Sequence, residues 1–161
     1  MKKELVLRQA MLKDVDQMYT LTNHFAEEKK MLPKSKPQLL GALFNYHVAV
    51  VGEESIGTCG VKIWGDQSVE LVSLAIQERC QGHGVGTRLI QENVKKCCKI
   101  GFRRFFAMTV VPNFFTRIGF EPVDYSKSSL KVWVDCATCP RNAAHPGDKE
   151  CNEKAVEIVL G

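Results

Sequence analysis

Residues 69–99 join three segments that together restrict how this chain can fold: a nearly all-apolar run, a glycine-rich loop and an amphipathic run. The apolar run, VELVSLAI at 69–76, predicts a central strand. In the loop, RCQGHGVGT at 79–87, three glycines alternate with other residues. Apolar residues then recur at helical spacing until Gly101, which predicts a helix. This order predicts an α/β (α+β) fold in which a loop with few side chains, because of its glycines, leads into a helix.

The segments on either side alternate between strand and helix patterns. They predict strands at 5–7, 47–51, 56–64, 105–111 and 154–160, helices near 14–25 and 34–44, and a short helix opened by Pro112 and capped by Gly119. Residues 52–55 predict a hairpin. A chain of 161 residues suits one core better than two, so we expect a single domain over 1–161. The polar, cysteine-containing stretch at about 126–153 indicates a long connection before the closing strand.

Composition and charge exclude several classes of protein. The basic residues behind a net charge of +4 are scattered, so we expect no nucleic-acid partner, although the charge suits an anionic ligand. The N-terminal MKKELVLRQA lacks the apolar core of a signal peptide, and no stretch approaches the roughly 20 apolar residues of a membrane span. We therefore expect a cytoplasmic protein with no membrane contact. There, seven cysteines are expected as free thiols or metal ligands.

The glycine loop by itself fits two interpretations. Its Gly-x-Gly-x-Gly spacing matches neither the dinucleotide-binding fingerprint nor the P-loop. Residues 82–87 still offer consecutive backbone N–H groups at the positive end of a helix dipole, and Gly84 and Gly86 let a pyrophosphate approach the backbone closely. Phosphate binding and a plain structural turn are both open on this evidence.

Residues 69–94 resemble the acetyl-CoA-binding core of the GNAT superfamily of N-acetyltransferases. The family's Gln/Arg-x-x-Gly-x-Gly/Ala signature is met at residues 81–86. LRQAMLKD at 7–14 is similar to the family's opening motif, and FFTRIGFEPV at 114–123 is similar to its aromatic-rich helix ending in Gly-Phe. The resemblance covers most of the chain. It implies the GNAT fold, with a central, mixed, mostly antiparallel sheet flanked by helices, and acetyl-CoA as cosubstrate.

A narrower likeness is to the short, single-domain N-acetylglutamate synthases of arginine biosynthesis. MLPKSKPQL at 31–39 is similar to that group's Leu-Pro-Arg/Lys-Ser segment. KVWVDCATCP at 131–140, with a further cysteine after it, is similar to the group's C-terminal motif. This likeness implies acetyl transfer from acetyl-CoA to the α-amino group of a small amino acid, with glutamate first. A homodimer is compatible with these features.

The resemblance also implies the residues of the site. Glu70 lies six residues before Ile76 and matches the family's general base, which an amine needs because it is mostly protonated near neutral pH. An outward-facing charge at the start of a strand is the alternative. The backbone around Leu74, Ala75 and Ile76 would bind the pantetheine arm and stabilise the oxyanion. The residues implied for the pyrophosphate are Gln81, Gly82, His83, Gly84, Val85, Gly86 and Thr87.

Three departures from the family pattern bear on mechanism and substrate. Phe115 stands where many members have the tyrosine that protonates the leaving thiolate, a replacement that the glutamate synthases often share. Met108 stands where other members have asparagine. Thr109 is followed by two valines and not by the basic residue that glutamate synthases tend to have. The remaining candidate ligands for a substrate carboxylate are Arg8, Lys34 and Ser35, with solvated surface as the alternative.

The cysteines near the C-terminus pose a separate question. Cys136, Cys139 and Cys151, with His145 between them, supply four ligands that zinc would accept tetrahedrally. A structural zinc would hold the connection in place, and free thiols are the alternative.

Two function classes stay open. One is an acetyl-CoA-dependent N-acetyltransferase acting on an amino acid, another amine or a protein, and the other is a catalytically weak module that senses acyl-CoA, an amino acid, metal or redox state.

Overall fold

The computed structural model of the chain describes residues 2–124 and 153–161. They form two compact units, one of Met1–Val61 and Leu71–Lys99 and one of Lys62–Glu70 and Ile100–Gly161.

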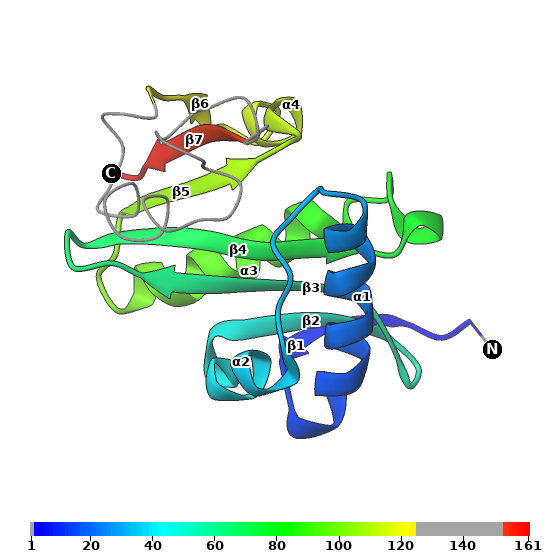
Figure 1. Cartoon of the computed structure of the whole chain (residues 1–161). Helices are drawn as coiled ribbons and strands as arrows, with labels where there is room; N and C mark the ends of the chain where they lie inside the picture. The colour runs from blue at the N-terminus through cyan, green and yellow to red at the C-terminus, as the bar shows by residue number, and fades with distance from the viewer. Residues whose placement is uncertain (1, 125–152) are drawn as a thin grey trace. The chain divides into compact units, whose positions relative to one another are not determined.

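Within the described residues, seven strands are hydrogen-bonded in the order β1-β2-β3-β4-β5-β7-β6 (Figure 1). β4 and β5 are parallel, whereas β1–β2, β2–β3, β5–β7 and β6–β7 are antiparallel. The predicted mixed, mostly antiparallel sheet with flanking helices is confirmed. The connection predicted at 126–153 lies almost wholly outside the described residues.

The first unit contains β1 (Leu5–Gln9), β2 (Tyr46–Val51), most of β3 (Glu54–Ile63) and the end of β4 (Ser68–Ile76). A tight hairpin joins β2 to β3. β2 and β3 pair up to Val51 and Glu54, so the turn between them is Gly52-Glu53, and Gly52 has a φ of 64°. The predicted hairpin is confirmed, but β3 begins two residues earlier than expected, because a two-residue turn is enough to reverse the chain.

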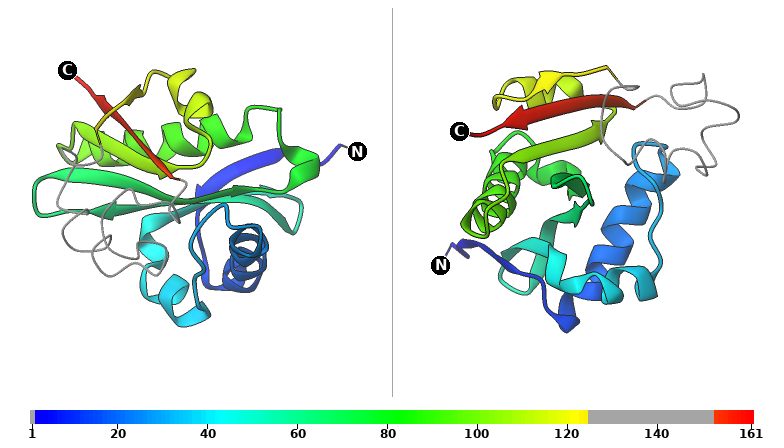
Figure 2. Two further views of the ribbon diagram at one scale, coloured as in Figure 1. Left: turned by 45° about the horizontal axis from the view of Figure 1, so that its top comes forward. Right: turned by 90° about the vertical axis from the view of Figure 1, so that its left-hand side faces the viewer.

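Three α-helices belong to the first unit: α1 (Val15–Glu27), α2 (Lys36–Gly41) and α3 (Val85–Lys99). Short 3-10 turns lie at Leu12–Asp14 (η1), Leu43–Asn45 (η2) and Glu78–Cys80 (η3). α2 is shorter than the predicted helix at 34–44, because Ser35 caps its start and the chain turns into η2 after Gly41. Figure 2 shows α1 and α2 on one face of the first unit's strands and α3 on the other.

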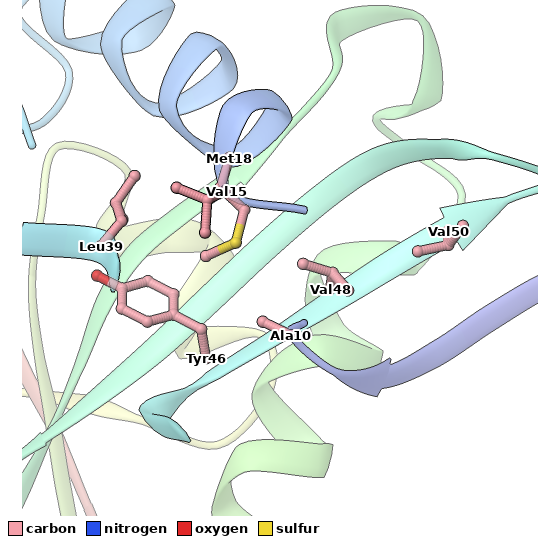
Figure 3. Close-up of a cluster of buried hydrophobic side chains, with 7 residues drawn as sticks. All are labelled: Ala10, Val15, Met18, Leu39, Tyr46, Val48 and Val50. Carbon is pink, nitrogen blue, oxygen red and sulfur yellow. The ribbon is translucent and has the colours of Figure 1, made fainter. Parts of the chain in front are cut away.

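Part of the core lies between α1, α2 and β2. The residues of α1 that recur at helical spacing in the sequence form its buried face: Val15, Met18, Leu21, Thr22 and Phe25. Figure 3 shows a cluster that it joins, made of Ala10, Val15, Met18, Leu39, Tyr46, Val48 and Val50. Met18, Leu39 and Val48 are fully buried. Burying a side chain of this size contributes about 1.5–3 kcal/mol, so this cluster fixes α1 and α2 on the sheet.

The second unit is built around two paired strands of six residues each. β5 (Arg104–Thr109) pairs with β4 through Ser68–Glu70 and with β7 (Lys154–Val159) along its whole length. α4 (Pro112–Thr116) begins at Pro112 as predicted. β6 (Glu121–Pro122) was not predicted, because two residues that include a proline carry no alternating pattern. Among the described residues, none of the helices combines the length and apolarity that crossing a membrane requires.

Candidate active site

The glycine loop joins β4 to α3 within the first unit. Gly82 and Gly84 have φ values of 78° and 80°, in the left-handed region that favours glycine. A Cβ atom placed on either residue would meet no other atom within 4 Å. Conformation and not crowding therefore requires glycine here. Residues 81–84 are exposed, so their backbone is accessible from solvent.

Helix α3 begins directly after this loop. The N–H of Arg88 donates to the carbonyl of Gly84 at 3.1 Å, which is the first hydrogen bond of the helix. The N–H groups of Val85, Gly86 and Thr87 thus lie in the first turn, where a helix supplies them with no acceptor. Gln81 Nε2 donates to the carbonyl of Ile76 at 3.0 Å and ties the loop to the end of β4. The structure brings the whole predicted pyrophosphate set together.

The backbone of β4 departs from extended geometry at Ser73, three residues after Glu70, although the strand continues to Ile76. Ser73 has a φ of 53°, which costs a residue with a side chain about 1–2 kcal/mol. The Tyr46 hydroxyl donates to Ser73 Oγ at 3.2 Å and holds it. Strained residues of this kind cluster at functional sites, where they redirect the backbone. Sequence reasoning missed Ser73, although it is the one polar residue between Leu71 and Ile76.

The residues predicted for the pantetheine arm follow Ser73 directly. Leu74 is half-buried, while Ala75 and Ile76 are buried. Ala75 packs with Leu21 and Phe25 of α1. The side chains are therefore committed to packing, as expected, and only the backbone of this segment is suited to hydrogen bonding with a ligand.

Glu70 lies at the last parallel pair between β4 and β5, opposite Phe106. Only 3% of Glu70 is exposed, so it does not face outward. The indole N–H of Trp64 donates to Glu70 Oε1 at 3.3 Å, and the Lys62 ammonium lies 4.2 Å from the centre of the Trp64 ring. A buried carboxylate requires such partners. Trp64 was not found from the sequence, because the contact depends on the turn between β3 and β4.

Phe115, which stands where many GNAT enzymes have a tyrosine, packs in the hydrophobic core. Phe115 is buried in α4 and makes edge-on contacts with Phe114 and Phe120, with ring centroids 5.2 Å apart in both pairs. Thr109 Oγ1 accepts the N–H of Val111 at 2.9 Å. A phenylalanine side chain cannot supply a proton to a leaving thiolate.

Lys34 and Ser35 line an open pocket of about 680 Å³ in the first unit. Tyr19 and Asn23 of α1 form its other wall, and residues 33–38 supply the rest. Ser35 is the N-cap of α2: its hydroxyl accepts the N–H of Gln38 at 3.2 Å, and its own N–H donates to Gln38 Oε1 at 2.8 Å. Because a hydroxyl that accepts one hydrogen bond still carries a proton, Ser35 remains a donor for a ligand.

Arg8 is placed differently from the other two predicted carboxylate ligands. It donates to both oxygens of Asp14, at 2.7 and 3.0 Å, and is not among the residues that line this pocket. Burial acts to raise the pKa of Asp14, but hydrogen bonds from Arg8 and the Met11 N–H outweigh it and leave that pKa lowered. The structure thus ties Arg8 to η1 and brings only Lys34 and Ser35 together.

The predicted zinc ligands Cys136, Cys139, His145 and Cys151 lie outside the described residues, so the zinc site stays a prediction. Within the described part of the chain, His24, Glu28 and Glu78 place potential ligand atoms within 4.8 Å of one another. All three are exposed. Glu78 lies 3.0 Å from the His24 ring nitrogen and raises the pKa of His24, while Glu28 pairs with Lys30 at 2.7 Å. These contacts are those of surface ion pairs, and we assign no metal to them.

The chain is similar to a known protein family and to several known proteins. Residues 12–120 match the acetyltransferase (GNAT) family. An uncharacterized N-acetyltransferase from Chlorobaculum tepidum is 27% identical over 154 residues, which cover 96% of each chain.

Two solved structures share the fold at low sequence identity. An N-acetylglutamate synthase from Neisseria gonorrhoeae, complexed with coenzyme A and N-acetyl-glutamate, matches with a TM-score of 0.86 at 20% identity, and the match covers 100% of this chain and 36% of the synthase. The chain thus spans about a third of that enzyme's length. A Mycobacterium tuberculosis protein in complex with coenzyme A matches with a TM-score of 0.81 at 19% identity, covering 97% of this chain and 99% of that one.

Proposed function

Because the chain belongs to the acetyltransferase (GNAT) family and is an acetyl-CoA-dependent N-acetyltransferase, we propose that its acceptor is the α-amino group of a small amino acid, with glutamate first. The observation that carries this proposal is the pocket lined by Lys34 and Ser35. Its volume is in the range of small-molecule sites, and an ammonium beside a hydroxyl at a helix start suits a carboxylate. The complex of the Neisseria gonorrhoeae synthase with N-acetyl-glutamate supports glutamate as the first amino acid to test.

In this proposal the cofactor is bound by main-chain groups. The pyrophosphate of acetyl-CoA accepts hydrogen bonds from N–H groups of residues 82–87, where the dipole of α3 favours negative charge. The pantetheine arm lies along the backbone of residues 74–76, and one N–H of that segment donates to the thioester carbonyl. The left-handed backbone of Ser73 sets the direction of that N–H.

Glu70 is the proposed general base. It takes a proton from the substrate ammonium, directly or through water, so that the neutral amine can attack the thioester carbon. The Trp64 N–H donates to Glu70 Oε1 and orients the carboxylate. The C–N bond forms, the C–S bond breaks, and the attacking nitrogen loses its second proton to water. The leaving thiolate takes a proton from water, because Phe115 has none to give.

A second acceptor class is favoured by one observation. Val110 and Val111 follow Thr109 where the glutamate synthases tend to have a basic residue, so a contact to a second carboxylate is missing from that segment. An amino acid without an acidic side chain, or another amine, would not need that contact.

The test is thiol release from acetyl-CoA across a panel of glutamate, glutamine, aspartate, alanine, a polyamine and a short peptide. We expect glutamate to give the highest kcat/KM. Replacing Glu70 with glutamine should lower kcat roughly 100- to 10,000-fold and leave the Kd of acetyl-CoA unchanged. Activity on the polyamine or peptide with none on the amino acids would overturn the acceptor assignment, and an unaltered kcat in Glu70→Gln would remove Glu70 from the mechanism.

A further inference from the structure

Asn23 of α1 pairs with both main-chain polar groups of Lys34. Asn23 Nδ2 donates to the carbonyl of Lys34 at 2.8 Å, and Asn23 Oδ1 accepts the N–H of Lys34 at 3.3 Å. The same Nδ2 donates to the carbonyl of Tyr19 at 2.9 Å, one turn earlier in the helix. A single amide side chain thus holds Lys34 as a neighbouring strand would, and its own helix fixes the amide in turn.

The helix that carries Asn23 is well anchored. Leu21, Thr22 and Phe25, on either side of Asn23, are buried, and Leu21 and Phe25 pack with Ala75 of β4. The connection between α1 and α2 has no regular structure at residues 32–35, and most of its side chains are exposed. Asn23 therefore transfers the rigidity of α1 to one residue of this connection.

Lys34 is the residue for which such support matters. A lysine side chain has four rotatable bonds and loses about 2 kcal/mol of rotamer entropy when it is fixed. Freedom in its main chain would add to that loss. Ser35 follows directly, and its main-chain N–H is held by Gln38, so the two neighbouring polar residues of the pocket are both fixed by side-chain amides.

We propose that Asn23 is a positioning residue for carboxylate recognition, which acts through Lys34 and sets the affinity for a small acceptor that carries a carboxylate. This inference rests on the proposed function, because it takes Lys34 and Ser35 as the residues that bind the acceptor. It assigns to Asn23 no contact with the reacting atoms.

The same helix supplies a matched control. Gln17 Oε1 accepts the N–H of Ser55 at 2.7 Å, and Gln17 Nε2 donates to the carbonyl of Glu53 at 3.2 Å. Gln17 thus holds the β2–β3 hairpin in the way that Asn23 holds Lys34, and neither Gln17 nor that hairpin lines the pocket. Replacing either amide removes hydrogen bonds between α1 and a loop, but only one of the two loops carries candidate ligands.

The experiment compares Asn23→Leu with Gln17→Met, which remove the amides at nearly constant volume. With the acceptor that the thiol-release panel identifies, Asn23→Leu should raise the acceptor KM about tenfold and leave kcat and the KM of acetyl-CoA unchanged. Gln17→Met should lower Tm about as much as Asn23→Leu does, but it should leave all three constants unchanged. An acceptor KM that rises equally in both variants, or in neither, would overturn the inference.

A double variant tests whether Asn23 acts through Lys34. If it does, Asn23→Leu combined with Lys34→Met should have the acceptor KM of Lys34→Met alone. Additive increases would mean that Asn23 acts by another route and would overturn the inference.

Amide hydrogen exchange separates this inference from the proposed function. Asn23→Leu should lower the protection of the Lys34 N–H, whereas Gln17→Met should lower that of the Ser55 N–H. If the panel yields no carboxylate-bearing acceptor, the proposed function fails and the role in recognition fails with it, even where the Lys34 N–H loses protection. If such an acceptor is found but Asn23→Leu leaves the Lys34 N–H protected, this inference fails by itself.

Discussion

The glycine loop and the pocket around Lys34 are suited to hold ligands by opposite means, although both lie at the start of a helix. In the loop the proposed recognising groups belong to the backbone, and Gly82 and Gly84 matter because their φ values are positive. In the pocket the proposed recognising groups are the side chains of Lys34 and Ser35, which Asn23 and Gln38 hold in place. Backbone recognition should thus tolerate most side-chain changes away from the glycines. Side-chain recognition should be sensitive both to the ligand residues and to their supports.

The largest effect should come from a side chain at Gly84. Gly84→Val places a β-branched residue at a φ of 80°, which distorts the loop and obstructs the approach of a pyrophosphate. Two charge-assisted hydrogen bonds lost at about 1.5 kcal/mol each amount to about 100-fold in the Kd of acetyl-CoA. Isothermal titration calorimetry with coenzyme A measures this change.

Gly101→Val is the matched control for backbone strain. Gly101 has a φ of 106°, and a Cβ there would also meet no atom within 4 Å, but it follows α3 instead of preceding it. Both variants should lose a similar amount of stability, and only Gly84→Val should lose cofactor affinity. Near-normal binding of coenzyme A by a folded Gly84→Val variant would mean that the loop is only a structural turn.

A smaller effect should follow from removing the Lys34 ammonium. Lys34→Met should raise the KM of the amino acid about tenfold, because one charge-assisted hydrogen bond is lost, and leave acetyl-CoA binding unchanged. Lys36 lines the same pocket, pairs with Asp16 at 2.9 Å and lies over the Tyr19 ring, so Lys36→Met should change the KM less. Steady-state kinetics with the acceptor varied will distinguish them. Equal effects of the two substitutions would show that the pocket acts only through its net charge.

The contact between His47 and helix α3, which follows the glycine loop, should make the stability of the protein depend on pH. His47 Nδ1 lies 3.0 Å from Asn93 Oδ1 of α3, and Asn93 Nδ2 donates to the carbonyls of Cys59 and Leu89. Burial lowers the pKa of His47 from its ordinary value of 6.5. The unfolded chain therefore binds this proton at a higher pH than the folded chain does. The contribution of His47 to stability is complete above pH 6.5 and is lost as the pH falls below it.

Thermal unfolding between pH 7.5 and 5 tests this prediction. His47→Gln should reduce the loss of Tm on acidification relative to the unaltered chain. His24 works in the opposite sense, because Glu78 raises its pKa and its contribution is therefore lost as the pH rises. His24→Gln should accordingly make the acid loss steeper. A pH dependence of Tm that His47→Gln leaves unaltered would show that the His47–Asn93 contact does not couple to protonation.

Sequence patterns predicted those parts of the molecule whose signals are local. Alternating glycines before a helical pattern predicted the loop, and apolar spacing predicted the buried face of α1. The hydroxyl of Ser35 three residues before Gln38 is likewise a local signal for a helix start. In each case the physical cause lies within one turn or one helix, so neighbouring residues are enough to identify it.

The missed features depend on residues far apart in the chain. Trp64 meets Glu70 only because β3 and β4 are joined by a tight turn, and Asn23 meets Lys34 across the α1–α2 connection. The strain at Ser73 is maintained by Tyr46 of β2. Arg8 was predicted as a substrate ligand because a guanidinium suits a carboxylate, but the sequence did not reveal that Asp14 is that carboxylate in the structure.

The smallest effect should come from His83, which lies between the two left-handed glycines and is exposed. If the loop binds pyrophosphate through its backbone, His83→Ala should change the Kd of coenzyme A by less than about twofold, as for an exposed residue that makes no contact. Isothermal titration calorimetry with coenzyme A measures this change. A tenfold loss would mean that the His83 side chain binds the anion. The loop would then recognise its ligand by side chains, as the Lys34 pocket does, and the contrast between the two regions would no longer hold.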